Sequence, residues 1–341
     1  QKTQLPGVAF GWPSGWSFGA GLIAVLVLMP ILSVFWIAAN PVENIWPHLM
    51  ATTLPRYLGN TLIVMVSVAV LATVVGTLTA WLVVMYRFPG RRWLEWALLM
   101  PLAVPGFLGA YALVDFLDFS GPVQTGLREM FGWVSAQDYM FPDIRSRAGA
   151  ILVLAASLYP YVYLLARAGF REQSGAAHDV ARALGANGFK RFWRVGLPLA
   201  RPAIVAGTAI VMMETVNDFG TVDYFGVQTL TTGVFSVWLE AGNAGGAAQI
   251  ATLILALIFA LVALEKISRR KAKFHRMARQ DREAAATPLS GAQSWLATVF
   301  CLVPFLFGFL LPVLVMLSHA ITRPDRWFAP GLFEAFANTV F

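Results

Sequence analysis

The sequence predicts an all-α fold, a polytopic transmembrane helical bundle, from three observations. Of the 341 residues, 58% are hydrophobic and only 13% are charged, which lies outside the usual balance of soluble globular domains. Apolar runs of roughly 20 residues, the length at which a helix crosses a hydrocarbon core about 30 Å thick, recur along the chain. The runs are continuous, whereas a transmembrane β-barrel needs alternating segments of about ten residues.

Seven apolar runs are predicted to be membrane-spanning helices. They cover residues 18–39, 61–86, 93–117, 149–168, 203–222, 246–265 and 295–320. An eighth run begins at Asn338-Thr339-Val340. The first run resembles a secretory signal because small residues follow Trp36, but its length and the single Lys2 before it favour an uncleaved anchor.

The positive charges predict the orientation of these helices. Nineteen of the 25 Lys and Arg residues lie before the first run, between the second and third, between the fourth and fifth, or after the sixth. Because positive side chains accumulate on the cytoplasmic side, the amino terminus and these loops are predicted to be cytoplasmic. The net charge of +7 is then an orientation signal, and no nucleic-acid partner is expected.

Two parts of the chain resemble each other. Each has an apolar run with an internal proline, an outer loop containing Trp and Pro, and then an Asn-Thr pair, at Asn60-Thr61 and at Asn338-Thr339. Repeated helical units are common in transporters, although chance likeness between apolar segments is an alternative. The predicted organisation is a first half with six transmembrane helices over 1–270, a cytoplasmic linker over 271–294, and the beginning of a second half over 295–341.

The most basic loop has the pattern of two short helices. Its first helix is expected to end at Gly185, because that residue and Asn187-Gly188 favour left-handed conformations. The second is expected to run from Phe189 and to stop at Leu197-Pro198. Its aromatic and basic side chains would lie on different sides: Phe189, Phe192 and Trp193, against Lys190, Arg191 and Arg194. Such a surface predicts either a protein docking element or a hairpin lying on anionic lipid.

Seven residues of this loop keep a fixed spacing. The pattern starts with Asp179-Val180-Ala181 and has Gly185 after a gap of three residues. Val195 follows after a gap of nine residues, and Leu197-Pro198 after a gap of one. This spacing resembles the cytoplasmic EAA loop of ATP-binding-cassette importer permeases, with Asp for the Glu and Val for the first Ala and for the Ile. The resemblance implies a type I importer permease fold, with a coupling loop at 171–200 in which these seven residues dock on an ATPase dimer.

The ATPase is expected to be a separate protein. No stretch of the chain fits G-x-x-x-x-G-K-[ST], so nothing in it would cradle nucleotide phosphates. ATP and Mg²⁺ are therefore expected on the partner and no cofactor in this chain, which is expected to be a transport component and not an enzyme.

Charged residues within the fifth run indicate the substrate path. A charge inside a membrane-spanning helix costs roughly 2.5–3.5 kcal/mol on insertion scales and is usually retained for a pathway or a partner. Glu214 and Asp218 are expected to share one helix face, with Asn217 beside them and Asp223 at the outer end. Three roles stay open: hydrogen-bonded carboxyls of which one is protonated, gating, and transient contact with a hard cation. No resident metal site is assigned.

Three further stretches are similar to iron(III)-transport permeases of ferric-binding-protein-dependent importers, in which two permease halves are fused. They read ETVNDFGTVDYFGVQTLTTGVFSVW, PLAVPGFLGAYAL and FPDIRSRAGAILVL, and the resemblance covers most of residues 55–275. It implies transport of ferric iron, delivered by a periplasmic binding protein, across the inner membrane of a bacterium. Permeases for thiamine, polyamines and phosphonates share the fold. Outside that class, the alternative is a proton-coupled carrier that uses Glu214 and Asp218 as its relay.

Other residues carry weaker expectations. Pro101, Pro105 and Pro160 are predicted to break helices and could line a cavity. Cys301 is expected to be a buried, inert thiol. The outer loop 118–148 is expected to contain a short amphipathic helix, which would either dock a binding protein or act as a lid on the bundle.

Overall fold

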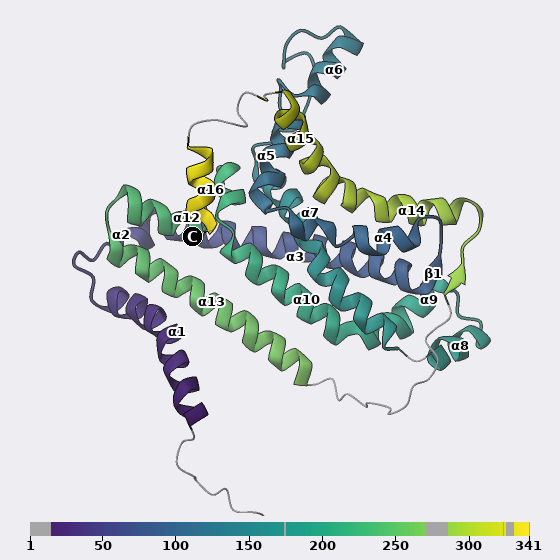
Figure 1. Ribbon diagram of the computed structural model, residues 1–341, viewed down its shortest axis with the longest axis horizontal. Coiled ribbons are helices and arrows are strands. Elements are labelled where there is room, and N and C mark those ends of the chain that lie inside the picture. The colour runs from purple at the N-terminus through teal and green to yellow at the C-terminus, as the bar shows by residue number, and fades with distance from the viewer. Residues whose placement is uncertain (1–14, 174, 271–285, 323, 325–330, 341) are drawn as a thin grey trace, which may run out of the picture.

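The protein is a bundle of long helices (Figure 1), seen in a computed structural model that describes residues 15–173, 175–270, 286–322, 324 and 331–340. Six helices in the described residues are long and apolar enough to cross a membrane, or up to seven if one bent pair is counted as a span. The predicted all-α polytopic bundle is confirmed. Lys2 and most of the predicted linker, residues 271–285, lie outside the described residues.

The predicted first half begins with α1 (Gly15–Ala39), α2 (Trp46–Ala51), α3 (Leu54–Met85) and the short strand β1 (Tyr86–Arg87). It continues through α4 (Arg91–Ala97), the 3₁₀ turn η1 (Met100–Ala103), α5 (Gly106–Leu117), α6 (Pro122–Phe131), α7 (Arg147–Arg171), α8 (Gly175–Ala183) and α9 (Gly188–Arg191). The π turn η2 (Phe192–Gly196), α10 (Leu197–Asn217), α11 (Gly220–Tyr224), α12 (Leu230–Phe235), the π turn η3 (Ser236–Glu240) and α13 (Ala244–Arg270) complete it.

The centre of the bundle is the packing of α3, α7 and α10. Gly76 of α3 lies so close to α7 that a Cβ there would be 2.8 Å from the carbonyl oxygen of Tyr159. Gly207 of α10 approaches the same helix, where a Cβ would be 2.8 Å from the Cα of Val162. Small residues let helix backbones approach in membranes, where association depends on close packing.

The third predicted span, 93–117, is not one helix. The α4–η1 segment and the α5–α6 segment are bent by 97°. The break falls at Val104-Pro105, between η1 and α5, because a proline has no amide hydrogen to donate and pushes the residue before it out of the helical region. Val104 accordingly has an extended backbone, with ψ of 115°. Pro101 lies within the 3₁₀ turn η1. Pro160 does not break its helix, since α7 runs continuously through it, and that prediction was wrong.

The predicted second half begins with β2 (Thr287–Pro288), α14 (Gly291–Phe305), the π turn η4 (Leu306–Leu310) and α15 (Leu311–Thr322), and α16 (Leu332–Val340) follows. Strands β1 and β2 pair in parallel, with Tyr86 opposite Thr287. α14 packs beside α3 and α4, and α15 beside α5. The Cys301 side chain is buried, as predicted. The division into two halves stays a prediction.

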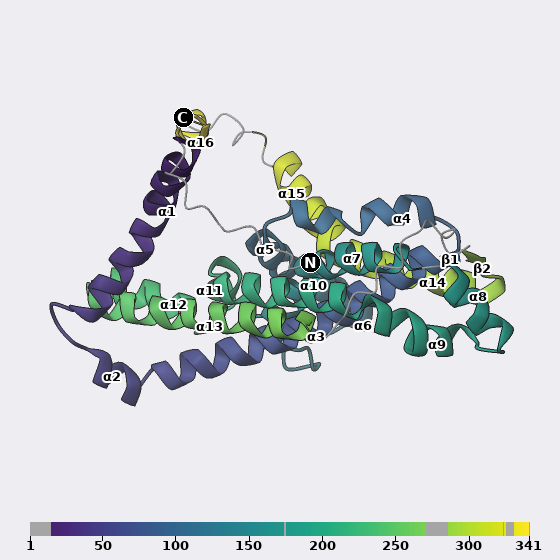
Figure 2. The same ribbon diagram turned by 90° about the horizontal axis from the view of Figure 1, so that it is seen from below.

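Two outlying helices complete the shape. α1 leans away from the bundle (Figure 2) and packs mainly on α13, leaving its apolar side chains exposed. The predicted amphipathic helix of the loop 118–148 is present as α6, which projects from the bundle beyond α5 (Figure 1). Met130 and Phe131 of α6 are exposed, and the role of this helix stays a prediction.

Candidate functional site

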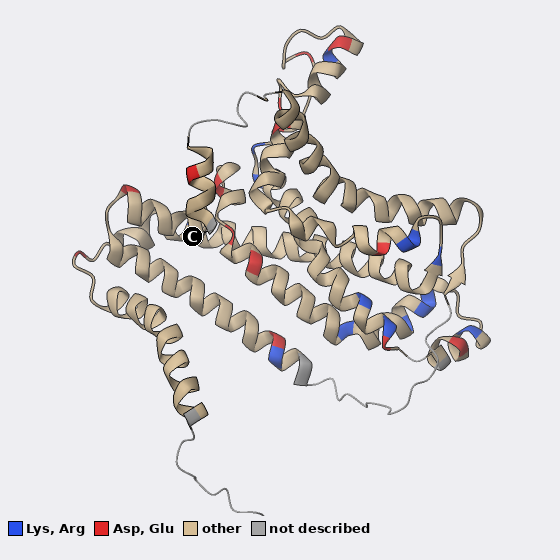
Figure 3. Cartoon of the chain, in the orientation of Figure 1, with Lys and Arg blue, Asp and Glu red and all other residues tan. Residues whose placement is uncertain are grey.

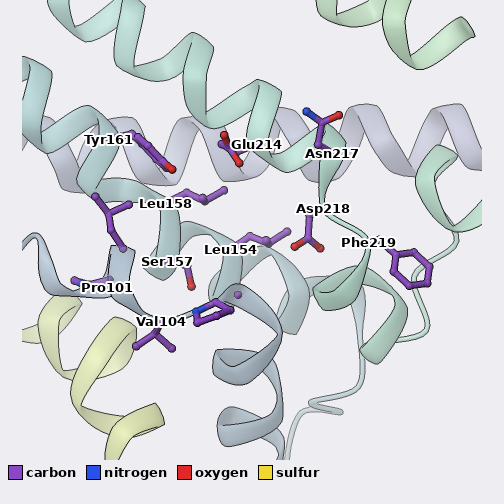
Figure 4. A pocket seen from close by; sticks show the side chains of 13 residues that line it. Pro101, Val104, Leu154, Ser157, Leu158, Tyr161, Glu214, Asn217, Asp218 and Phe219 are labelled. Atoms are coloured by element: carbon purple, nitrogen blue, oxygen red, sulfur yellow. The ribbon is translucent and has the colours of Figure 1, made fainter. Parts of the chain in front are cut away.

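A cavity of about 380 Å³ lies where α10 ends and the α4–α5 segment bends. Its polar lining comes from α7 and the end of α10: Ser157, Tyr161, Glu214, Asn217 and Asp218 (Figure 4). Its apolar wall includes Pro101, Pro105 and Gly106 from the bend, with Leu154, Leu158 and Phe219. The prediction that Pro101 and Pro105 could line a cavity is confirmed.

Asp218 is placed by a helix end. α10 stops at Asn217, and Asp218 has an extended backbone with ψ of 128°. Its carboxylate accepts hydrogen bonds from the backbone amides of Thr221 and Val222, at 3.0 and 3.1 Å, and from the Thr221 hydroxyl at 2.9 Å. Short acidic side chains often bond to nearby amides in this way and so compete with helix continuation. The prediction of one shared helix face for Glu214 and Asp218 is therefore wrong, although both side chains line the same cavity.

Gly106 leaves room for this arrangement. It begins α5, and a Cβ built on it would be 2.7 Å from the Thr221 hydroxyl oxygen and 3.7 Å from Oδ2 of Asp218. Any larger residue would push against the hydroxyl that holds the carboxylate. Sequence reasoning missed Gly106, Ser157 and Thr221, because their roles depend on a contact between α5, α7 and α11 that no local spacing reveals.

Glu214 is the second carboxylate of the cavity. Its side chain is exposed to the cavity and makes no hydrogen bond or ion pair within the part of the chain that the structure describes. The Tyr161 phenol points toward it from α7 (Figure 4) and experiences its charge. Among the described residues, no Lys or Arg lines the cavity. Asp223, which was predicted to follow along the path, is exposed on α11 and is not part of the lining.

The second feature is the hairpin formed by α8 and α9, which we call the hairpin and define as residues 175–196. Gly185 has φ of 77°, in the left-handed region. The amide of Ala186 donates to the carbonyl of Ala181, and the amide of Gly185 donates to that of Arg182, both at 2.9 Å. This is the Schellman pattern that ends a helix, so the predicted turn at Gly185 is confirmed. Asn187 instead caps α9, since its side chain accepts from the Lys190 amide at 2.9 Å.

The second helix of the hairpin does not stop at Leu197-Pro198. It passes through the π turn η2 into α10, so that one helical segment runs from Gly188 to Asn217. The prediction of a stop was wrong because the wider π turn accommodates the proline, whose missing amide hydrogen would otherwise interrupt the helix. The hairpin is thus joined by a single helix to the residues that line the cavity.

The seven predicted coupling positions lie in the hairpin or directly after it, and four of them are exposed. Asp179, Val180, Gly185 and Pro198 are exposed, whereas Ala181, Val195 and Leu197 are half-buried. Leu184, Phe189 and Trp193 add exposed apolar area, with basic residues around them (Figure 3). Phe192 and Arg191 differ from the prediction because they turn inward and are buried, with the Phe192 ring 5.2 Å from that of Trp81.

A buried histidine attaches the hairpin to the bundle. Nε2 of His178 lies 2.8 Å from the amide oxygen of Gln173, and the Gln173 amide donates to the carbonyl of Gly196 in the π turn at 2.9 Å. The His178 ring also packs 5.8 Å from that of Trp81. Burial, and then the charge of Arg191, lower the pKa of His178 below its ordinary value of 6.5. Sequence reasoning missed this contact, because His178 has no partner at a recognisable spacing.

Asn60 and Thr61, the first of the two Asn-Thr pairs, hold the loop beyond the cavity. The Asn60 side chain donates to the carbonyl of Gln228 at 2.8 Å, and the Thr61 hydroxyl accepts from the amide of Leu230 at 2.9 Å. In the same loop, Thr231 donates to the carbonyl of Asp218 at 2.8 Å. Asn60 and Thr61 therefore support the segment whose Thr231 is bonded to Asp218.

The bundle, its cavity and the hairpin define a polytopic membrane protein of the transport class. Residues 72–273 match the family of the binding-protein-dependent transport system inner membrane component, and the chain belongs to this family. This membership confirms the resemblance to importer permeases.

The curated relatives are named for the transport of different solutes. The chain is 25% identical over 286 residues to the Fe(3+)-transport system permease protein FbpB 2 of Haemophilus influenzae, an alignment that covers 83% of this chain and 52% of the relative. The chain therefore spans about half the length of that relative. It is 28% identical over 207 residues to the molybdenum transport system permease protein ModB of Escherichia coli, covering 58% of this chain and 87% of the relative. Against the sulfate transport system permease protein CysT of Escherichia coli, 27% of 209 residues are identical, over 60% of this chain and 71% of the relative.

Solved structures support the fold. A bacterial alginate ABC transporter in complex with its oligosaccharide-bound periplasmic protein matches with a TM-score of 0.60 at 15% identity, covering 76% of this chain and 96% of that chain. The MetNI methionine ABC transporter matches with a TM-score of 0.51 at 18% identity, covering 65% of this chain and 97% of that chain.

Proposed function

We propose that the protein is a permease subunit of an ATP-driven importer of the ATP-binding-cassette class, and that the hairpin is where the ATPase dimer docks. The helix from Gly188 to Asn217, which joins the exposed hairpin to the cavity, is the observation that carries the proposal. ATP and Mg²⁺ would bind to the ATPase, and a periplasmic binding protein would deliver the solute. The chain would lie in a bacterial inner membrane with its amino terminus and hairpin in the cytoplasm.

The contacts around Asp218 suggest how ATP hydrolysis could open and close the cavity. Glu214 lies on α10 and would move with the hairpin, whereas Asp218 is bonded to α11 and to the loop at Thr231. A shift of α10 would therefore change the separation of the two carboxylates. That change would favour binding of a solute in one state and its release in the other, which is the requirement for alternating access.

We propose ferric iron as the solute. The polar lining of the cavity offers oxygen atoms from two carboxylates, Glu214 and Asp218, together with the hydroxyls of Ser157 and Tyr161 and the amide of Asn217. Oxygen donors of this kind suit hard cations. Sulfate is an anion, and two carboxylates with no Lys or Arg among the described lining residues would repel it. The cargo of the Haemophilus influenzae relative agrees with this lining better than that of CysT does.

Uptake by the complete transporter in proteoliposomes tests both parts of the proposal. With iron-loaded binding protein outside and ATP at the ATPase, the Glu214→Gln/Asp218→Asn variant should import ⁵⁵Fe at least tenfold more slowly. Asp223→Asn is the matched control, because it removes an exposed carboxylate outside the cavity. Stimulation of the ATPase by binding protein loaded with sulfate, thiamine or spermidine, but not with iron, would reject the cargo. Uptake that needs no ATPase and collapses with the proton gradient would reject the class and support a carrier.

A further inference from the structure

An excess of positive charge gathers where α4 and α7 meet, at the end of the bundle that carries the hairpin. The α4 arginine cluster, as we call it, comprises Arg87, Arg91, Arg92, Arg167 and Arg171. Arg91 experiences repulsion from Arg171, Arg87 and Arg92, which places each of these three within electrostatic reach of Arg91. Figure 3 shows basic residues on this part of α4 and β1.

Glu95 is the one carboxylate bonded to this cluster in the described part of the chain. Its Oε1 accepts from Arg167 and, at 2.5 Å, from Arg171, and the Tyr163 hydroxyl donates to its backbone carbonyl at 2.9 Å. Arg91 donates through Nε to the carbonyl of Val83 at 2.6 Å. One negative charge thus faces five positive charges, and no second carboxylate within the described residues is bonded to the cluster.

The cluster opens to the surface beside exposed aromatic rings. The Arg171 side chain is 45% exposed, whereas that of Arg167 is 10% exposed. Trp93 and Trp96 of α4 are 51% and 65% exposed, and the Arg167 guanidinium lies 5.7 Å from the Trp96 ring. A charged group and a wide apolar surface therefore adjoin on one face. Tryptophan is enriched where a membrane meets water, because one end of its ring is apolar and the other polar.

We propose that this face is a binding site for an anionic phospholipid, with Arg91 and Arg171 contacting the phosphate and Trp96 contacting the acyl chain. The charge excess supplies the electrostatic complement to an anionic headgroup, and basic pockets between transmembrane helices on the cytoplasmic side bind such headgroups. The site is separate from the cavity and the hairpin. It does not depend on the identity of the solute.

Native mass spectrometry of the full transporter in detergent tests the site, with phosphatidylglycerol and phosphatidylcholine of the same acyl chains as probes. Wild-type protein should bind phosphatidylglycerol more tightly. The Arg91→Gln/Arg171→Gln variant should weaken that binding by about thirtyfold, the effect expected for two basic side chains at an anionic surface. The ion pair between Arg167 and Glu95 remains in this variant, so α4 and α7 stay joined.

The matched control is Arg201→Gln/Lys266→Gln, which removes two exposed positive charges from α10 and α13, outside the cluster. Its binding of phosphatidylglycerol should stay within about twofold of wild type. The proposal would be overturned if wild-type protein bound the two lipids equally, or if the cluster variant bound phosphatidylglycerol as tightly as wild type. It would also be overturned if the control variant lost as much phosphatidylglycerol binding as the cluster variant. Displacement of the lipid by inorganic phosphate would overturn it as well, since the site would then be one for a soluble anion.

Discussion

Because Gly185 has a left-handed conformation, replacing it should destabilise the hairpin even though the new side chain would contact no other residue. Gly185 has φ of 77°, and a Cβ built there would meet no heavy atom within 4 Å. Replacing it with valine therefore causes no clash, and the cost is only that of forcing a β-branched residue into a conformation it rarely adopts. The two bonds that end α8, from Gly185 and Ala186, depend on that conformation.

The magnitude follows from the backbone alone. A residue with a Cβ in the left-handed helical region costs roughly 1–2 kcal/mol, which corresponds to a factor of about 5 to 30 in the population of the folded hairpin. Valine should lie at the upper end of this range and alanine near the lower end. Asparagine tolerates the left-handed region, so Gly185→Asn should stay within about twofold of wild type.

Hydrogen exchange of residues 175–196 in the membrane-embedded protein, together with copurification of the ATPase, measures these effects. Protection of the α8 amides from exchange should be highest in Gly185→Asn, lower in Gly185→Ala and lowest in Gly185→Val. Retention of the ATPase and solute flux should decrease in the same order. Protection of α3, α7 and α10 should not change, which shows that the protein stays inserted. An order that follows side-chain size, with asparagine as damaging as valine, would refute the conformational explanation. Normal copurification with Gly185→Val would count against docking at the hairpin.

Two further predictions concern the cavity and the base of the hairpin. Gly106→Ala places a methyl group 2.7 Å from the Thr221 hydroxyl that holds Asp218; overpacking of this kind costs about 1–3 kcal/mol. It should lower both thermal stability and ⁵⁵Fe uptake, whereas Gly59→Ala, with open space around it, should not. The pKa of His178 is lower in the folded hairpin than in the unfolded one. As the pH falls below about 6.5, His178 is therefore protonated in the unfolded hairpin before it is protonated in the folded one. The free energy of unfolding of the hairpin should be constant above about pH 6.5 and should decline below it. Hydrogen exchange of α8, corrected for intrinsic rates, should show this decline in wild type and lose it in His178→Gln; an equal decline in both would contradict the role of His178.

Much of the bundle was predictable, because the determining signals are local. An apolar run of sufficient length predicts a membrane-spanning helix whatever its neighbours are, and the six long helices fall where the runs lie. Gly185 predicted a helix end through its own backbone freedom. The family pattern around Asp179 likewise depended only on spacing. The ATPase contact, the cargo and the orientation that these signals suggest stay predictions.

The tertiary structure decided where helices continue and where they end. Asp218 ends α10 because Thr221 and Val222 offer their amides, and Thr231 from another loop fixes its carbonyl. The helix continues through Leu197-Pro198 because the π turn η2 precedes them, and Phe192 of this turn packs on Trp81. At Leu197-Pro198 the contacts from a distant part of the chain, around Trp81, outweigh the local tendency of proline to stop a helix. At Asp218 the bonds to nearby amides act together with the bond from Thr231. Sequence therefore determined the lengths of the helices and the turn of the hairpin, whereas long-range packing placed the two carboxylates in one cavity and joined that cavity to the hairpin.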